Sequence, residues 1–240
     1  MIVGGDLRDP RLAALAQLYD EIWDWAHTNY DRHLVKRNIG AVDPTSRLFI
    51  VGEAHAEDQV RLTGINWFDA WGTPGRSGEN LDAILRCLRY TIYPPKPVRL
   101  SRGQVQPKDG EFTTVYTTDI FPCYPRGGTP TRTMITDALK QRFLARELEI
   151  LQPRVILLLG KESYTAFHTQ FLGAAPRANI TTRFRDLSPT TELAEYNGAP
   201  VVPFLHPSPG NGHFSSWFSR SRLTLCEQPQ LQAIAAALER

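Results

Sequence analysis

Apolar, β-branched and aromatic residues gather in four short runs that are separated by helical patterns and by turns. The runs are 47–51, 113–118, 154–160 and 201–205, and their near-continuous apolar character is typical of strands covered on both faces. Around them, apolar residues recur at helical spacing over 10–26, 77–88, 135–151, 161–171, 215–222 and 230–238. Strands that alternate with helices predict right-handed parallel crossovers. We therefore expect an α/β fold: a three-layer α/β/α sandwich with a central, mainly four-stranded parallel sheet.

Outside these elements, the sequence predicts a helix cap, an exposed loop and an irregular segment. Asp9 stands before Pro10 as the expected N-cap of the first helix. Residues 94–111 are rich in Pro, Lys and Arg and predict an exposed loop, and residues 173–199 predict an irregular segment that carries three arginines. The chain shows no internal repeat and no low-complexity tract.

The composition is that of a soluble globular protein. With 240 residues the chain can bury a sizeable core and is most simply a single domain over 1–240. Its residues are 42% hydrophobic and 22% charged, and no apolar run reaches the length of a membrane span. The first residues lack the basic region and apolar core of a signal peptide. We expect a monomer with no membrane partner.

The cysteines and the net charge indicate the cellular compartment and the partners that are compatible with the sequence. Cys87, Cys123 and Cys226 are widely scattered and form no C-x-x-C pair, which argues against a disulfide framework and against a zinc site. A reducing, cytoplasmic location fits this usage best. The net charge of +2 permits a nucleic-acid partner without demanding one, so any basic surface would be local.

Chemically useful side chains stand where the expected strands end. Glu53 follows the first strand, Asp119 follows the second, and His206 follows the last, directly before the turn residues Pro-Ser-Pro-Gly-Asn-Gly. In an open parallel sheet, ligands bind just beyond the carboxyl ends of the strands. The pattern therefore predicts a site at this edge; a histidine that merely caps its strand is the alternative for His206. The chain lacks G-x-G-x-x-G and G-x-x-x-x-G-K-[ST], which counts against dinucleotide and P-loop chemistry.

Segments in the matching order resemble motifs of the uracil-DNA glycosylase superfamily, and the pattern is most similar to its thermostable family 4 type. The similarity extends over residues 47–218. It is carried by Gly52-Glu53-Ala54 with the nearby Glu57-Asp58, by Gly75-Arg76-Ser77-Gly78, by Thr118 to Pro125, by Gln152 to Gly160, and by His206-Pro207-Ser208 with Pro209 and Asn211. The resemblance implies a glycosylase that extrudes a nucleotide from DNA, stacks its base on an aromatic ring and hydrolyses its N-glycosidic bond.

The resemblance also implies roles for individual residues. His206, Glu53 and Asp58 would be catalytic: His206 would hydrogen-bond the departing base, and the carboxylates would position water or stabilise the cationic sugar. Asp119, Phe68, Trp71 and Gly52 would form the base pocket, with Phe68 as the stacking ring and Trp67 or Trp71 as alternatives. The DNA backbone would be held by Ser77, Gly78, Ser208, Gly210 and Asn211, and the segment 212–214 would act as a wedge in the base stack.

The chain departs from the family pattern at three places. The family's iron–sulfur cluster needs four cysteine thiolates, and only Cys123 stands where a ligand would be, so we expect no cluster and no metal. His55 and Ala56 replace the Pro-Gly of the first motif. Asp119 occupies the slot where the family usually has an Asn that reads the base.

These features lead to a functional expectation with two alternatives. We expect a monofunctional DNA base-excision glycosylase that acts on uracil or a related deaminated or damaged base. The altered motifs keep open a superfamily member that binds nucleic acid or a damaged base but has lost most of its catalysis. A third class is a small-molecule nucleotide or nucleoside enzyme on a flavodoxin-like sheet.

Overall fold

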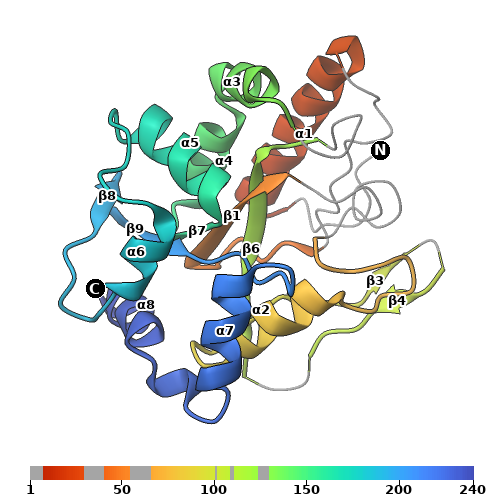
Figure 1. Cartoon of the computed structure of the whole chain (residues 1–240). Coiled ribbons are helices and arrows are strands. Elements are labelled where there is room, and N and C mark those ends of the chain that lie inside the picture. The colour runs from red at the N-terminus through yellow and green to blue at the C-terminus, as the bar shows by residue number, and fades with distance from the viewer. Residues whose placement is uncertain (1–7, 30–40, 55–65, 101, 109–110, 124–129) are drawn as a thin grey trace.

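The computed structural model describes residues 8–29, 41–54, 66–100, 102–108, 111–123 and 130–240, which form three layers (Figure 1). The main sheet of this described part has the strand order β6-β1-β7-β9-β8. Its parallel strands are β1 (Leu48–Ala54), β6 (Tyr116–Phe121), β7 (Val155–Leu159) and β9 (Ala199–Phe204), and β8 (Ala194–Tyr196) pairs antiparallel with β9 at one edge. The expected α/β/α sandwich is confirmed, and the four strands predicted from the sequence form the parallel core of this sheet.

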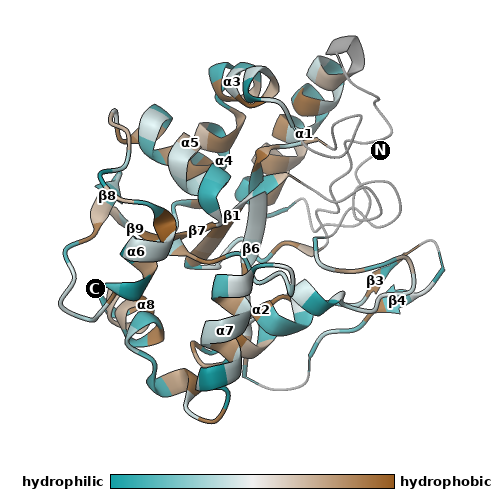
Figure 2. Ribbon diagram, viewed as in Figure 1, coloured by the Kyte–Doolittle hydropathy of each residue, from teal (hydrophilic) through white to brown (hydrophobic). Residues whose placement is uncertain are grey.

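Successive side chains along each strand point to opposite faces of the sheet and pack into two separate apolar cores. Along β1, Phe49 and Val51 face one core while Leu48 and Ile50 face the other. Figure 2 shows brown, hydrophobic stretches of the sheet near β7 and β9, and helices in which brown and teal residues are mixed. Because both faces of the strands are covered, the apolar runs are near-continuous rather than alternating.

Helices cover the sheet from both sides. One face packs against α1 (Pro10–Asn29), α3 (Arg132–Lys140), α4 (Phe143–Leu151) and α5 (Lys161–Phe171). The other packs against α2 (Arg76–Arg86), α7 (Gly212–Ser221) and α8 (Pro229–Glu239), while α6 (Ile180–Arg185) contacts β9. The carboxylate of Asp9 accepts the backbone N–H of Arg11 at 2.8 Å, which confirms it as the cap of α1. In this part of the chain no helix is both long and apolar enough to cross a membrane.

The structure corrects several sequence-based expectations about elements. The long helix expected through 135–151 is divided into α3 and α4, because Arg142 adopts a left-handed backbone with φ of 60°. The expected loop over 94–111 contains a small ribbon of β3 (Val98–Arg99) and β4 (Gln104–Val105). A second small pair joins β2 (Tyr90–Thr91) to β5 (Thr113–Thr114). The segment 173–199, expected to be irregular, contains α6 and β8.

The expectation that the cysteines form no disulfide is wrong. Cys87, at the end of α2, is bonded to Cys226, which lies in the short 3₁₀-helix η4 (Leu225–Glu227). The two residues are 139 positions apart, and only the packing of α2 and the segment after α7 on the same face of the sheet brings them together. The cysteines therefore give no support to the expected reducing, cytoplasmic location.

Candidate active site

A cavity of about 620 Å³ opens at the carboxyl ends of the parallel strands. It is bounded by the ends of β1, β6 and β7, by the segment after β9 and by the first turn of α2. Of the residues predicted from the sequence, it brings together Gly52, Glu53, Ser77, Gly78, Asp119, His206 and Asn211. The position at the strand ends is the one that the sequence pattern indicates.

The hydrogen bonding of His206 fixes which ring nitrogen carries the proton. Its Nδ1 accepts the backbone N–H of Ser208 at 3.2 Å, so in the neutral ring the proton sits on Nε2. Burial lowers the pKa of His206 below its usual value, and the Asp119 carboxylate opposes this shift only in part. His206 is therefore a neutral imidazole near pH 7, and it presents an Nε2–H donor on the side of the ring away from the turn.

The turn after His206 is tied to the two helices beside it. The Asn80 side chain of α2 donates to the carbonyl of Pro207 at 3.0 Å, and the Asn211 side chain donates to the carbonyl of His206 at 3.3 Å. The Asn211 carbonyl oxygen also accepts the N–H of Phe214 and so caps α7. These bonds hold the imidazole in one place relative to the cavity.

Asp119 and Gly52 form a matched pair across neighbouring strands. They lie opposite each other in the β1–β6 register, and Asp119 is 8% exposed. A Cβ on Gly52 would overlap the Oδ1 atom of Asp119, so only glycine leaves room for this carboxylate to lie across β1. Gly52 thus shapes the cavity by its missing side chain, and Asp119 supplies the polar group at its wall.

A second carboxylate, Glu53, lies beside Asp119 in the cavity. Burial raises the pKa of Glu53 above its usual value, and the neighbouring carboxylates of Glu162 and Asp119 raise it further. A carboxyl group that is partly desolvated and surrounded by like charge gains a proton more readily than one in water. The cavity therefore combines carboxylates with a neutral imidazole, and the cations Arg76 and Lys161 also line it.

Among the described residues that line the cavity, Trp67 supplies a large aromatic ring, and the expectation for Phe68 is not supported by its position. Phe68 is 1% exposed and packs edge-on against Tyr93 in the core, outside the cavity. Trp71 is 59% exposed, lies under the guanidinium of Arg102 and does not line the cavity either. The Trp67 ring centroid is 6.2 Å from that of His206. The left-handed backbone of Trp67, with φ of 77°, orients the pair in this way.

The first turn of α2 approaches Trp67 closely. A Cβ on Gly78 would lie 2.9 Å from the Trp67 Cβ, so glycine at this position lets the helix and the ring pack together. Arg76 and Ser77, from the same turn, also line the cavity. This segment supports the wall that carries Trp67 in addition to any contact with DNA.

The remaining predicted residues lie elsewhere. The Ser208 hydroxyl accepts the N–H of Gly210 at 3.2 Å within the turn, and neither residue lines the cavity. Phe214 is fully buried against Phe218, so the segment 212–214 cannot act as a wedge through this ring. Asp58 lies outside the described residues.

The cysteines do not fit a four-thiolate cluster. The chain has three cysteines, and two of them form the disulfide. The third, Cys123, is buried, and burial strongly raises the pKa of its thiol, whereas a cluster ligand must be a thiolate. Within the described ranges, no group of three or more His, Cys, Asp or Glu side chains could hold a metal ion. The absence of a cluster stays a prediction.

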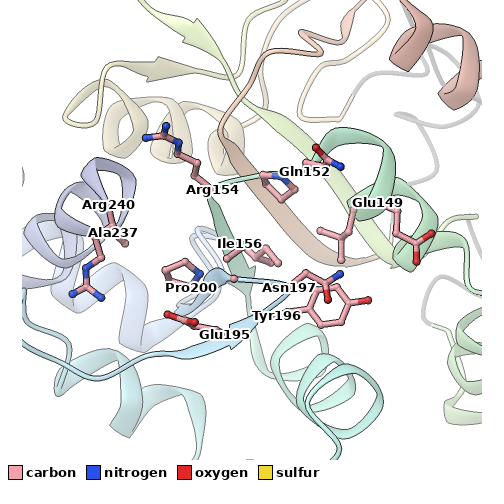
Figure 3. A pocket seen from close by; sticks show the side chains of 14 residues that line it. Glu149, Gln152, Arg154, Ile156, Glu195, Tyr196, Asn197, Pro200, Ala237 and Arg240 are labelled. Atoms are coloured by element: carbon pink, nitrogen blue, oxygen red, sulfur yellow. The ribbon is translucent and has the colours of Figure 1, made fainter.

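A second cavity of about 590 Å³ lies at the opposite edge of the sheet, near the amino ends of β7 and β9 (Figure 3). Its charged residues are of both signs, and Figure 3 shows Glu149 on the other side of the cavity from Arg154 and Arg240. Because these groups do not converge on one point, the cavity at the carboxyl ends is the better candidate.

Several residues of the site were not predicted from the sequence. Lys161 and Glu162 follow β7 directly and line the cavity together with Gly160. The rule that pointed to Glu53 and His206 applies equally to the end of this strand, so the signal was present. Asn66, which is 6% exposed, also lines the cavity and follows no such rule.

Comparisons with known proteins agree with this geometry. The family model for the uracil DNA glycosylase superfamily matches residues 39–225, which include every described strand of the main sheet and the whole described cavity. A comparison with curated proteins finds no match to this chain. Members of the matched family act on DNA, and the match supports a glycosylase-like function in general. The chain belongs to the uracil DNA glycosylase superfamily.

Proposed function

We propose that this protein is a monofunctional DNA glycosylase that hydrolyses the N-glycosidic bond of uracil or a related deaminated or damaged base. The observation that carries the proposal is the neutral imidazole of His206 in the cavity at the strand ends of a superfamily member. A neutral imidazole can donate a hydrogen bond to a base oxygen and keep its proton while the base leaves.

Some residues of the cavity contact the base, and others stabilise the charge that develops on the sugar. The extruded base enters between Trp67 and the strand ends, where Asp119 faces its polar edge. As the bond between C1′ and the base nitrogen breaks, negative charge grows on the base and is met by the His206 Nε2–H. Positive charge grows on the sugar and is met by the Glu53 carboxylate. The base leaves as an anion, and water adds at C1′ and releases one of its protons to solvent. The base anion takes up a proton from solvent, so the products are the free base and a sugar with a hydroxyl at C1′.

The alternative of a weakly active or inactive binder is favoured by the acidic wall. Asp119, Glu53 and Glu162 all line the cavity, and an ionised carboxylate accepts hydrogen bonds but donates none. Such a wall opposes a departing anion while it stabilises a cationic sugar. The balance between these effects decides the rate, and Asp119 is the residue that tests it.

Replacing Asp119 by asparagine is expected to increase uracil excision by about tenfold. An amide offers one donor and one acceptor, which match the O4 and N3–H of uracil, whereas a carboxylate faces O4 with a second acceptor. A polar pair left unmatched in a closed pocket costs about 1–3 kcal/mol, and ~1.4 kcal/mol corresponds to a tenfold rate. The measurement is single-turnover excision of uracil from single- and double-stranded DNA by both proteins.

The matched control is Asp69→Asn, because the Asp69 carboxylate binds backbone N–H groups of its own loop and does not line the cavity. That substitution should leave the excision rate unchanged. Equal rates for the parent and Asp119→Asn in both substrates would show that residue 119 does not read the base.

The excision rate should fall as the solution is acidified. Glu53 has a pKa raised above its usual value, so it loses its charge at a higher pH than a free glutamate does. Protonation of His206 places a proton on Nδ1, where it would oppose the Ser208 N–H. A rate profile from about pH 5 to 8 should therefore show an acid limb and a plateau near neutrality. In Glu53→Gln the plateau should be lower and the acid limb shallower; an unchanged profile would exclude Glu53 from the reaction.

A further inference from the structure

A second groove of about 470 Å³ joins the base cavity at its mouth. Both hollows are lined by Gly160, Lys161, His206 and Asn211, so they form one continuous depression. The far wall of the groove is made by α6 and by Asn179, the residue before it. This wall comes from the segment 173–199, which was predicted from the sequence to be irregular.

The helix α6 is held firmly enough to present a fixed surface. Its Ile180 and Phe184 are 6% and 1% exposed, and the Phe184 ring packs edge-on against Phe204 and Trp217 at centroid distances of 4.9 and 5.1 Å. Ile180 also borders the groove, and Thr181, Thr182 and Arg185 supply the polar lining that comes from α6. Residues three and four positions apart share one face of a helix, so the hydroxyls and the guanidinium lie together.

The charge of the groove is opposite to that of the base cavity. The described lining of the base cavity carries three carboxylates against the two cations Arg76 and Lys161, whereas that of the groove carries the cations Lys161 and Arg185 and no acidic residue. Lys161 is 3.8 Å from the exposed Glu162 carboxylate, and both side chains reach water, so this pair neutralises the lysine only weakly. The Arg185 side chain is exposed and forms no ion pair that the structure records.

We propose that this groove binds the phosphodiester backbone of the DNA strand beside the extruded nucleotide, with Arg185 contacting a phosphate. The inference rests on the proposed function, since a nucleotide whose base lies in the cavity keeps both of its phosphates. In this proposal the strand passes His206 into the groove, whose described lining is basic and begins at the mouth of the cavity. A guanidinium matches the oxygens of a phosphate in a bidentate fashion, and threonine hydroxyls add donors beside it.

The test measures binding of Arg185→Gln to oligonucleotides that carry one uracil, over a series of salt concentrations. Glutamine keeps much of the length and polarity of the side chain and removes its charge, and the position is exposed, so the fold should persist. Affinity should fall by about tenfold for every sequence, and the slope of log K against log salt should decrease by ~1. The control is Arg240→Gln, which removes the same charge at the opposite edge of the sheet and should change neither quantity.

A second arm locates the contact. Single phosphates on either side of the uracil are replaced, one at a time, by neutral methylphosphonates. At one flanking position the parent protein should lose about tenfold in affinity while Arg185→Gln loses little, because the two changes remove the same contact. Equal losses for both proteins at every position, or no binding of DNA by the parent protein, would overturn the inference. Failure of the proposed function has a different signature, since it leaves this coupling intact while no base is released.

Discussion

The His206→Ala variant should excise bases about 10²–10³ times more slowly than the parent protein, while it folds and binds DNA. Removing one preorganised donor that faces developing charge typically has an effect of this size. The loss should appear in the single-turnover rate rather than in the affinity for DNA, because the hydrogen bond strengthens as charge grows on the base. Single-turnover kinetics together with DNA-binding titrations separate the two quantities.

The matched control for this variant is His168→Gln. His168 lies on α5 against Tyr164, outside the cavity, and its replacement should leave the excision rate close to that of the parent. Thermal unfolding of both variants checks that the fold persists. An excision rate of His206→Ala equal to that of the parent would remove His206 from the reaction.

The Gly52→Ala variant should lose about 10-fold or more of its excision rate and about 1–3 kcal/mol of stability. The added Cβ overlaps Oδ1 of Asp119, and β1 is hydrogen-bonded to β6 and to β7, so the strand cannot move aside easily. The added methyl group and the displaced carboxylate therefore take up space in the cavity that the base needs. Denaturant unfolding gives the stability, and single-turnover excision gives the rate.

Two further variants show whether the overlap is the cause. Gly75→Ala adds a methyl group in the same cavity where nothing lies within 4 Å, so it should cost little. In the double variant with Asp119→Ala the overlapping carboxylate is absent, so the added loss of stability from Gly52→Ala should largely disappear. Full additivity of the two stability changes would contradict the proposed packing of Gly52 against Asp119.

The sequence predicted the sheet and much of the site because both follow from simple rules. Near-continuous apolar runs mark strands covered on both faces, and polar residues directly after them must meet at one edge. Glu53, Asp119 and His206 were found in this way, and all three line the cavity. Lys161 lies just after β7 and also lines the cavity, so the same rule predicts its position at the site.

The parts that the sequence did not predict depend on backbone conformation or on distant packing. Trp67 and Phe68 are neighbours of similar chemistry, and the left-handed backbone at Trp67 decides which ring lines the cavity. The six residues of α6 are too few for a periodic signal, since only Ile180 and Phe184 turn inward. The bond between Cys87 and Cys226 joins positions that only the folded chain brings together.

Release of a free base from DNA distinguishes a glycosylase from a protein that only binds DNA. Oligonucleotides that each carry one uracil, hypoxanthine, xanthine or methylated base are incubated with an excess of the parent protein or of His206→Ala, and the released base is quantified. We expect the parent to release uracil or another deaminated or damaged base and to leave an abasic site, and we expect His206→Ala to release the base about 10²–10³ times more slowly. No release from any of these substrates by the parent, or equal release by both proteins, would contradict this expectation.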